Sequence, residues 1–301
     1  TMKLTKKILA ALLALVLVAA LSACSSAQKP AESPAETAVE SPAATDAAQP
    51  EESQAAEPTE TVKLVVGASP APHAEILEAV KPLLAEQGIE LEIEEFTDYV
   101  LPNQALEAGD LDANYFQHLP YLLNFNENNG TNLVSAGAIH FEPLGIYAGK
   151  SADLSNIPDG ATISVPNDAT NEARALQLLA ANGIITLPEG SGLDVTARDI
   201  VENPHNVEIL EIAAEQVPRS LEDVDFAVAN GNYALEAGIT DKLLTTEDKD
   251  SEGAKTYANV VAVRAGDEER PEIKALVEAL KSDTIRAFIE EKYGANVIPM
   301  F

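Results

Sequence analysis

Short apolar runs alternate with longer amphipathic segments over residues 61–301. The first run, Val62 to Val66, has the composition of a strand and ends at Gly67. After Pro70, apolar side chains recur with the 3.6-residue period of a helix until Gly88. The same patterns predict further strands over 89–96, 112–116, 132–139, 144–148, 162–165, 207–212, 226–229 and 260–263. They predict further helices over 101–108, 119–126 and 169–182, and two closing helices that carry the apolar positions 273–280 and 285–289.

The alternation of strands with helices predicts an α/β protein with mostly parallel sheets. Two such sets follow each other, and the late strand at 260–263 returns the chain to the first set. We therefore expect two lobes, each a mostly parallel sheet flanked by helices: lobe one comprises 61–142 and 258–301, and lobe two comprises 143–257. Ligands in such sheets bind beyond the carboxyl ends of the strands. The segments in which a site is expected are 67–73, 97–99, 115–118, 140–142, 166–174 and 230–233.

The first 60 residues do not follow this pattern. Three lysines precede an apolar stretch from Ile8 to Leu21, which is shorter than a membrane span of about 20 residues and fits the h-region of a signal peptide. The sequence Leu-Ser-Ala-Cys that ends at Cys24 resembles the bacterial lipobox, in which a peptidase cuts before the cysteine and the thiol receives a lipid. We expect residues 1–23 to be a signal peptide and Cys24 to be the lipidation site. Residues 24–60 are rich in Ala, Glu, Pro, Ser and Thr, which predicts a disordered acidic tether.

Charge and cysteine content exclude several classes of function. The chain has 19 Lys and Arg against 49 Asp and Glu, a formal net charge of −30, so it lacks the basic surface on which nucleic-acid affinity depends. Cys24 is the only cysteine, which excludes an intramolecular disulfide, a redox pair and a cysteine-based metal site. We expect no nucleic-acid partner, and contact with a membrane only through the lipid anchor.

The sequence also lacks the motifs of common enzymes. It contains no GxSxG, no P-loop, and no GxGxxG after a strand. Its four histidines have no HExxH or HxH spacing, which argues against a zinc site; they are His73, His118, His140 and His205. We therefore predict a protein without catalytic activity, cofactor or metal.

Polar residues in the segments after strands indicate ligand binding. Arg174 lies about two turns into a predicted helix, where a guanidinium can hold a carboxylate through two charge-assisted hydrogen bonds. The alternative for Arg174 is a surface ion pair with Glu172. Three asparagines lie in or near these segments: Asn167, Asn171 and Asn230. Their amides either cap helices or form hydrogen bonds with the amino and carboxyl groups of a ligand.

Three rings cluster near the end of the strand predicted over 112–116, in a chain with few aromatic residues. These rings, of Tyr115, Phe116 and His118, either belong to the core or line a pocket for an apolar side chain. The residues alone leave both alternatives open.

Five stretches resemble the MetQ/NlpA family, the methionine-binding lipoproteins of ABC importers. They are PHAEIL at 72–77, DANYFQH at 112–118, VPNDATN at 165–171 with Arg174, VENP at 201–204 and AVANGNYA at 227–234. Each stretch is moderately specific by itself. Together they follow the order of the family and span nearly all of residues 61–301.

The resemblance implies a two-lobed periplasmic-binding-protein fold of type II-like topology that closes on a small ligand. It implies that this ligand is methionine, as the L- and also the D-isomer, and that it is delivered to an ABC permease and its ATPase. A lipid anchor would hold the protein on the extracytoplasmic face of the cell membrane. The alternatives are the same fold with another amino acid or a short peptide as ligand, and a surface lipoprotein without transport function.

The resemblance also assigns roles to individual residues. Those that would hold the amino and carboxyl groups of the ligand are Arg174, Asn167, Asn171 and Asn230. Those that would surround its thioether are Tyr115, Phe116 and His118. Secondary candidates near neighbouring strand ends are Tyr99, His140 and His73.

Overall fold

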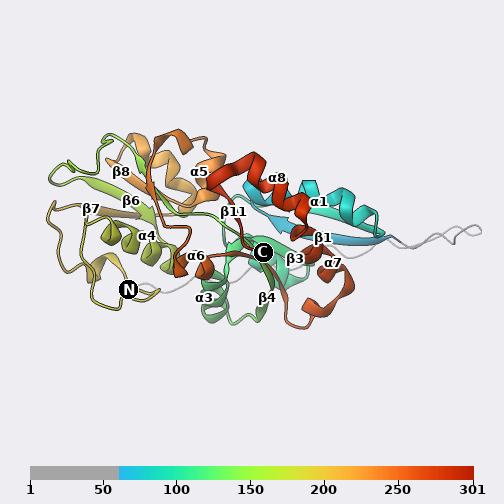
Figure 1. The fold of residues 1–301 in the computed structure, drawn as a ribbon. Coiled ribbons are helices and arrows are strands. Elements are labelled where there is room, and N and C mark those ends of the chain that lie inside the picture. Colours follow the sequence, from blue (N-terminus) through green and yellow to red (C-terminus); the bar gives the residue numbers. More distant parts are fainter. Residues whose placement is uncertain (1–60) are drawn as a thin grey trace, which may run out of the picture. The chain divides into compact units, whose positions relative to one another are not determined.

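The computed structural model describes residues 61–301, which form two β-sheets with helices packed on them (Figure 1). The predicted signal peptide, Cys24 and the predicted tether lie outside the described residues. The α/β class predicted from the alternating pattern is confirmed. No helix within residues 61–301 has both the length and the apolar character that a bilayer crossing requires.

The first sheet has six strands in the order β11-β4-β10-β3-β1-β2. Their bounds are β1 (Val62–Ala68), β2 (Ile89–Glu95), β3 (Ala113–His118), β4 (Leu133–Phe141), β10 (Asn259–Arg264) and β11 (Ile298–Pro299). The second sheet has five strands in the order β7-β6-β8-β5-β9. Their bounds are β5 (Gly145–Ala148), β6 (Thr162–Pro166), β7 (Glu208–Ile212), β8 (Phe226–Ala229) and β9 (Leu243–Thr246).

Both sheets are mixed, so the prediction of mostly parallel sheets is wrong. β1 is parallel to β2 and β3, and β6 is parallel to β7 and β8, but β10 and β5 are antiparallel to all their neighbours. The reason is that β5 and β10 each begin where the chain enters from the other sheet. Asn259 at the start of β10 lies opposite His118 at the end of β3, and Gly145 at the start of β5 lies opposite Ala229 at the end of β8.

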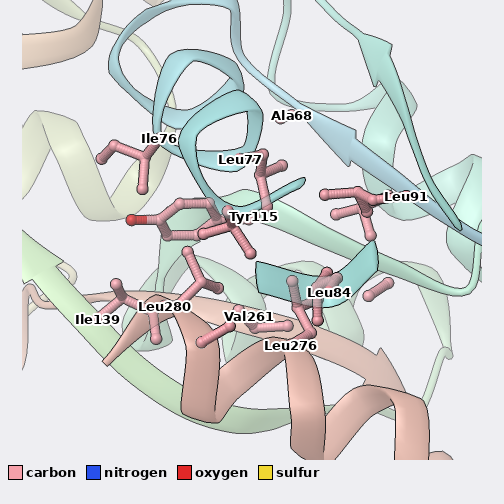
Figure 2. Packing of buried hydrophobic residues seen from close by; sticks show 14 of the residues in the cluster. Ala68, Ile76, Leu77, Leu84, Leu91, Tyr115, Ile139, Val261, Leu276 and Leu280 are labelled. Atoms are coloured by element: carbon pink, nitrogen blue, oxygen red, sulfur yellow. The ribbon is translucent and has the colours of Figure 1, made fainter. Parts of the chain in front are cut away.

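Helices cover both faces of the first sheet. α1 (Glu75–Ala85), α7 (Pro271–Leu280) and α8 (Asp283–Tyr293) contribute to one apolar cluster, and α2 (Leu101–Ala108) and α3 (Leu119–Asn129) to another. The alternation of strand side chains explains the division, because Leu64 and Val66 belong to the first cluster whereas Val65 packs against the second. Figure 2 shows the first cluster, in which the ring of Tyr115 lies among side chains of α1 and α7.

The second sheet packs chiefly against α4 (Ala169–Ala181), whose buried Leu176 and Leu179 contact apolar residues of β6 and β8. The side chain of Asp168 accepts a hydrogen bond from the backbone N–H of Asn171 and so caps the first turn of α4. Two short helices, α5 (Gly231–Glu236) and α6 (Glu252–Thr256), complete this part of the chain. α4 and α5 both begin at the same edge of the second sheet, because they follow the parallel strands β6 and β8.

Element boundaries differ from the prediction where proline or short length interferes. α1 begins only at Glu75, because Ala71 precedes Pro72 and is extended (φ −131°, ψ 141°). β3 continues to His118 and β4 to Phe141, each two residues beyond the predicted end. The pattern did not predict α5, α6, β9 or β11, since two to six residues are too few to establish a period.

Gly149, directly after β5, lies against the backbone of the segment that leads into β8. A Cβ atom at this position would lie 2.4 Å from the carbonyl oxygen of Val224 and 2.8 Å from that of Leu221. The backbone N–H of Gly149 also donates a hydrogen bond to the carbonyl oxygen of Asp225 (3.0 Å). These atoms belong to the backbone and cannot rotate away, so position 149 requires glycine.

We expect Gly149→Ala to lower the free energy of unfolding by about 1–3 kcal/mol, the usual cost of overpacking a close contact. Urea denaturation measures this change. Gly253→Ala in α6 is the matched control, since its Cβ would meet nothing nearer than the Ser251 hydroxyl at 3.3 Å. Equal stability of the two variants would contradict the prediction.

Candidate functional site

A cavity lies where the chain crosses between the two sheets. The first crossing joins β4 to β5 and the second joins β9 to β10. The cavity is lined by Tyr99, Phe116, Gln117, His118, Tyr121, Glu142, Asn171, Arg174, Asn230, Gly231, Asn232 and Asn259. It therefore lies beyond the carboxyl ends of β3, β6 and β8, where ligands bind in sheets of this type.

Arg174 supplies the positive charge of the cavity. Its Nε donates to Oε1 of Glu247 (2.7 Å), and its Nη2 donates to Oε2 of Glu247 (2.5 Å) and to the carbonyl oxygen of Glu142 (2.9 Å). The guanidinium carbon lies 4.4 Å from the ring centroid of Tyr257. Burial opposes the charge of Arg174, but Glu247 outweighs burial, and the pKa of the guanidinium is raised. Nη1 has no hydrogen-bond partner among residues 61–301, so the group is held in place with one nitrogen free for an anion.

Asn171 connects groups from the two sheets. Its Oδ1 accepts a hydrogen bond from Nδ2 of Asn230 (2.9 Å) and lies 3.1 Å from Nε2 of His118. Its Nδ2 donates to the carboxylate of Asp168. Nδ1 of His118 accepts from the backbone N–H of Tyr121 (3.2 Å), so the ring carries its proton on Nε2. The network fixes the orientation of the Asn171 and Asn230 amides.

Two buried amide atoms at the cavity lack a hydrogen-bond partner among the described residues. They are Oδ1 of Asn230, an acceptor, and Nδ2 of Asn232, a donor. The other amide oxygen, Oδ1 of Asn232, accepts from the hydroxyl of Tyr99 (2.5 Å). Because leaving a buried polar atom unpaired costs about 1–3 kcal/mol, these atoms favour a polar ligand group that pairs with them.

Aromatic rings form an apolar wall of the cavity. The ring of Tyr99 lies 5.8 Å from that of Phe116, 5.7 Å from that of Tyr121 and 4.9 Å from that of Tyr233. The hydroxyl of Tyr121 donates to the carbonyl oxygen of Tyr99 (2.9 Å). This wall offers ring faces and edges to an apolar side chain.

A buried group lies next to the cavity and consists of His73, His140 and Glu142. We call it the His–Glu cluster. Nε2 of His140 is 2.7 Å and Nε2 of His73 is 3.3 Å from Oε1 of Glu142. The hydroxyl of Tyr115 bonds Nδ1 of His140, and Oδ1 of Asn259 lies 3.0 Å from Nε2 of His73. Burial lowers the pKa of His73 to about 4 and that of His140 to about 3, so both rings are neutral at pH 7. Burial also raises the pKa of Glu142, against the opposing effects of His73 and Arg174.

The structure brings most of the predicted site residues to the cavity. Those that line it are Tyr99, Phe116, His118, Asn171, Arg174 and Asn230. Tyr115 and His140 are buried outside the lining, because successive side chains of β3 point to opposite faces and Tyr115 faces the core. Asn167 is exposed and does not line the cavity, and the cap of α4 is the neighbouring Asp168.

Half of the lining was not predicted from the sequence. These residues are Gln117, Tyr121, Glu142, Gly231, Asn232 and Asn259. Four of them fall in segments where a site was expected, which is a signal that could have found them: Gln117, Glu142, Gly231 and Asn232. Asn259 begins β10, and no sequence pattern places the start of a returning strand beside the ends of earlier ones.

Acid should destabilise the fold through His118. Burial lowers its folded-state pKa to about 3, whereas the unfolded value is about 6.5, so the unfolded state binds more protons between these values and stability falls as pH falls. Between pH 7 and pH 5 this amounts to ~2 kcal/mol of unfolding free energy. In His118→Gln, the unfolding free energy should fall by ~2 kcal/mol less than in wild type between pH 7 and pH 5. Urea denaturation at both pH values measures this difference. His205→Gln, in the loop before β7, is the control, and an equal drop in all three proteins would refute the argument.

Residues 64–301 match the family described as NlpA lipoprotein. The chain is 42% identical over 238 residues to membrane lipoprotein TpN32 of Treponema pallidum, covering 78% of this chain and 87% of that protein. It is 41% identical over 242 residues to methionine-binding lipoprotein MetQ of Bacillus subtilis, covering 79% of this chain and 88% of that protein.

Solved structures give the same result. A putative lipoprotein from Ruminococcus gnavus is 54% identical with a TM-score of 0.78, covering 79% of this chain and 99% of that one. A nutrient binding protein from Burkholderia cenocepacia, solved bound to methionine, is 41% identical with a TM-score of 0.75, covering 79% and 100%. An ABC transporter periplasmic substrate-binding protein from Coxiella burnetii is 40% identical with a TM-score of 0.74, covering 78% and 99%. The two-sheet α/β fold is thus that of ABC substrate-binding proteins, and the chain belongs to the NlpA lipoprotein family.

Proposed function

We propose that the protein is the substrate-binding lipoprotein of an ABC importer and that its cavity binds methionine. The observation that carries this proposal is the chemistry of the cavity wall. The lining contains the free Nη1 of Arg174 and the unpaired amide atoms of Asn230 and Asn232. It also contains the aromatic rings of Tyr99, Phe116 and Tyr121. An amino acid with an apolar side chain matches both kinds of group.

The polar groups of the ligand have separate partners. A carboxylate pairs with Arg174, whose guanidinium is already oriented by Glu247 and Tyr257. An ammonium group has the unpaired acceptor Oδ1 of Asn230, with the buried carboxyl group of Glu142 in the same lining. Since a zwitterion has no net charge, its binding leaves the charge balance of the buried site unchanged.

The side chain of the ligand lies against Tyr99, Phe116 and Tyr121 in this proposal. Contacts between a thioether sulfur and an aromatic ring contribute about 0.3–1.5 kcal/mol each. The methionine-bound relative from Burkholderia cenocepacia supports the same ligand.

Closure of two lobes would enclose the ligand. We treat 61–142 with 258–301 as one lobe and 143–257 as the other, hinged at the two crossings. Hydrogen bonds already join the two sides of the cavity, from Tyr99 to Asn232 and from the Tyr233 hydroxyl to the carbonyl oxygen of Thr97 (3.2 Å). A ligand that contacts both sides favours this closed arrangement.

The N-terminal segment would keep the protein near its permease. In this proposal residues 1–23 direct export, Cys24 carries the lipid, and residues 24–60 form the tether on the extracytoplasmic face. Anchoring raises the local concentration of the binding protein at the ABC permease and its cytoplasmic ATPase.

Isothermal titration calorimetry tests the ligand after bound molecules are removed by unfolding and refolding. The panel is L-methionine, D-methionine, norleucine, leucine and glycyl-methionine. We expect L-methionine to bind, D-methionine to bind more weakly, and norleucine, which lacks the sulfur, to lose the sulfur–aromatic contribution. No heat with either isomer of methionine contradicts the ligand, and tighter binding of glycyl-methionine favours a peptide. Absence of any ligand-induced thermal shift favours a surface lipoprotein without transport function.

A further inference from the structure

The His–Glu cluster brings three metal-binding atoms together in the interior. They are Nε2 of His73, Nε2 of His140 and Oε1 of Glu142, and the potential ligand atoms of these residues lie within 4.8 Å of one another. The exposed fractions of the three residues are 1%, 0% and 5%. Methionine binding, as proposed above, uses neither histidine.

We propose that the His–Glu cluster is a binding site for a first-row transition-metal dication of the Zn²⁺ class. Two imidazole nitrogens and one carboxylate oxygen are the donor set of many three-ligand zinc sites. Metal bonds of ~2.0–2.1 Å in a tetrahedral site separate the ligand atoms by about 3.3 Å. The separation between His73 and Glu142 is already 3.3 Å, and the separation between His140 and Glu142, now 2.7 Å, must lengthen to reach the same value.

The surroundings of His140 fit a metal site, whereas Nδ1 of His73 is buried without a hydrogen-bond partner among the described residues. The Tyr115 hydroxyl bonds Nδ1 of His140, which holds the ring with Nε2 toward Glu142, as outer partners of metal-binding histidines do. Oδ1 of Asn259, 3.0 Å from Nε2 of His73, would be the fourth ligand. No lysine or arginine side chain forms an ion pair with Glu142 among the described residues.

Hydrogen bonds alone leave the cluster incompletely paired. Nε2 of His73 lies beside two oxygen atoms, those of Glu142 and Asn259, and has one proton at most to share between them. A cation between these atoms bonds to all of them at once. Glu142 also lines the ligand cavity, so an ion reaches the cluster from the cavity and needs no second channel.

Titration of the metal-stripped full-length protein with Co²⁺ tests the proposal, with a purification tag that contains no histidine. We expect one equivalent of Co²⁺ with the visible d–d absorption of a low-coordinate site, displaced by Zn²⁺. His73→Gln and His140→Gln should lose this absorption. His205→Gln, which changes a histidine outside the cluster, and Cys24→Ser, which removes the only thiol, should keep it.

Wild-type protein that binds no stoichiometric Co²⁺ overturns the proposal and identifies the cluster as a hydrogen-bond network. Absorption that persists in both cluster variants overturns it as well. If the cluster variants fail to fold, the comparison of Zn²⁺-dependent thermal shifts in wild type and His205→Gln decides. Equal, saturable shifts support the site, and no shift in either protein refutes it.

Discussion

Arg174→Ala should reduce the affinity for L-methionine by about 30-fold to several thousand-fold, equivalent to ~2–5 kcal/mol. Arg174 is 3% exposed, and its guanidinium is the cation that the ligand carboxylate meets in the proposed complex. Without it the carboxylate enters a site that still contains Glu142 and Glu247. Titration calorimetry with L-methionine measures the loss. Arg198→Ala, an exposed arginine between α4 and β7, is the control and should bind as wild type does.

The same change should also destabilise the fold, and the two effects can be separated. Arg174→Ala leaves the partly buried Glu247 without its partner. Removing one partner of a buried ion pair lowers the free energy of unfolding by about 3–5 kcal/mol. The double variant Arg174→Ala with Glu247→Ala removes both charges and should regain much of that stability. It should not regain binding. A double variant that binds methionine as tightly as wild type would refute the role of Arg174, whatever the stability of the single variant.

Arg174, Asn171 and Asn230 could be found from the sequence because each follows a parallel strand within a few residues. Parallel strands end at a common edge, so residues that follow different strands are brought together there. Tyr115 shows the limit of this argument. The predicted strand ended at residue 116, so Tyr115, Phe116 and His118 were treated as one group, but β3 continues to His118 and the pleat sends Tyr115 to the other face.

The direction of the returning strands could not be predicted from local pattern. The strands that follow a crossing from the other sheet, β5 and β10, have the same apolar pattern in the sequence as the other strands. Their antiparallel direction follows from where each crossing begins, as the pairing of Asn259 with His118 shows. The second crossing brings Asn259 to the cavity, which explains why this residue was missed.

The His–Glu cluster shows the same limit for the contacts between residues that are far apart in the chain. His73 and His140 are far apart in the chain and have no metal-binding spacing, so the sequence predicted no metal site. They meet because the turn that precedes α1 and the end of β4 lie at the same edge of the first sheet. Spacing motifs detect ligands that share one element, and these two histidines lie on different elements.

Gly231→Ala should lower the affinity for L-methionine by about 5- to 150-fold. Gly231 begins α5 between the two asparagines that carry unpaired amide atoms. A Cβ atom there would lie 2.9 Å from Cβ of Glu142 and 3.0 Å from its Oε2. Glu142 is buried and bonded to His140, so its Cβ cannot swing away as an exposed side chain would.

Either Glu142 or the start of α5 must therefore move, and both line the cavity. The cost of such overpacking, about 1–3 kcal/mol, should fall on binding because the groups displaced are those that meet the ligand. Calorimetry gives the affinity, and thermal denaturation checks that the variant is folded. Gly253→Ala in α6, where the nearest atom to the added methyl group is the Ser251 hydroxyl at 3.3 Å, should bind as wild type does. Unchanged affinity of folded Gly231→Ala would mean that the ligand does not depend on the contact between α5 and Glu142, and the proposed position of its ammonium group would then be wrong.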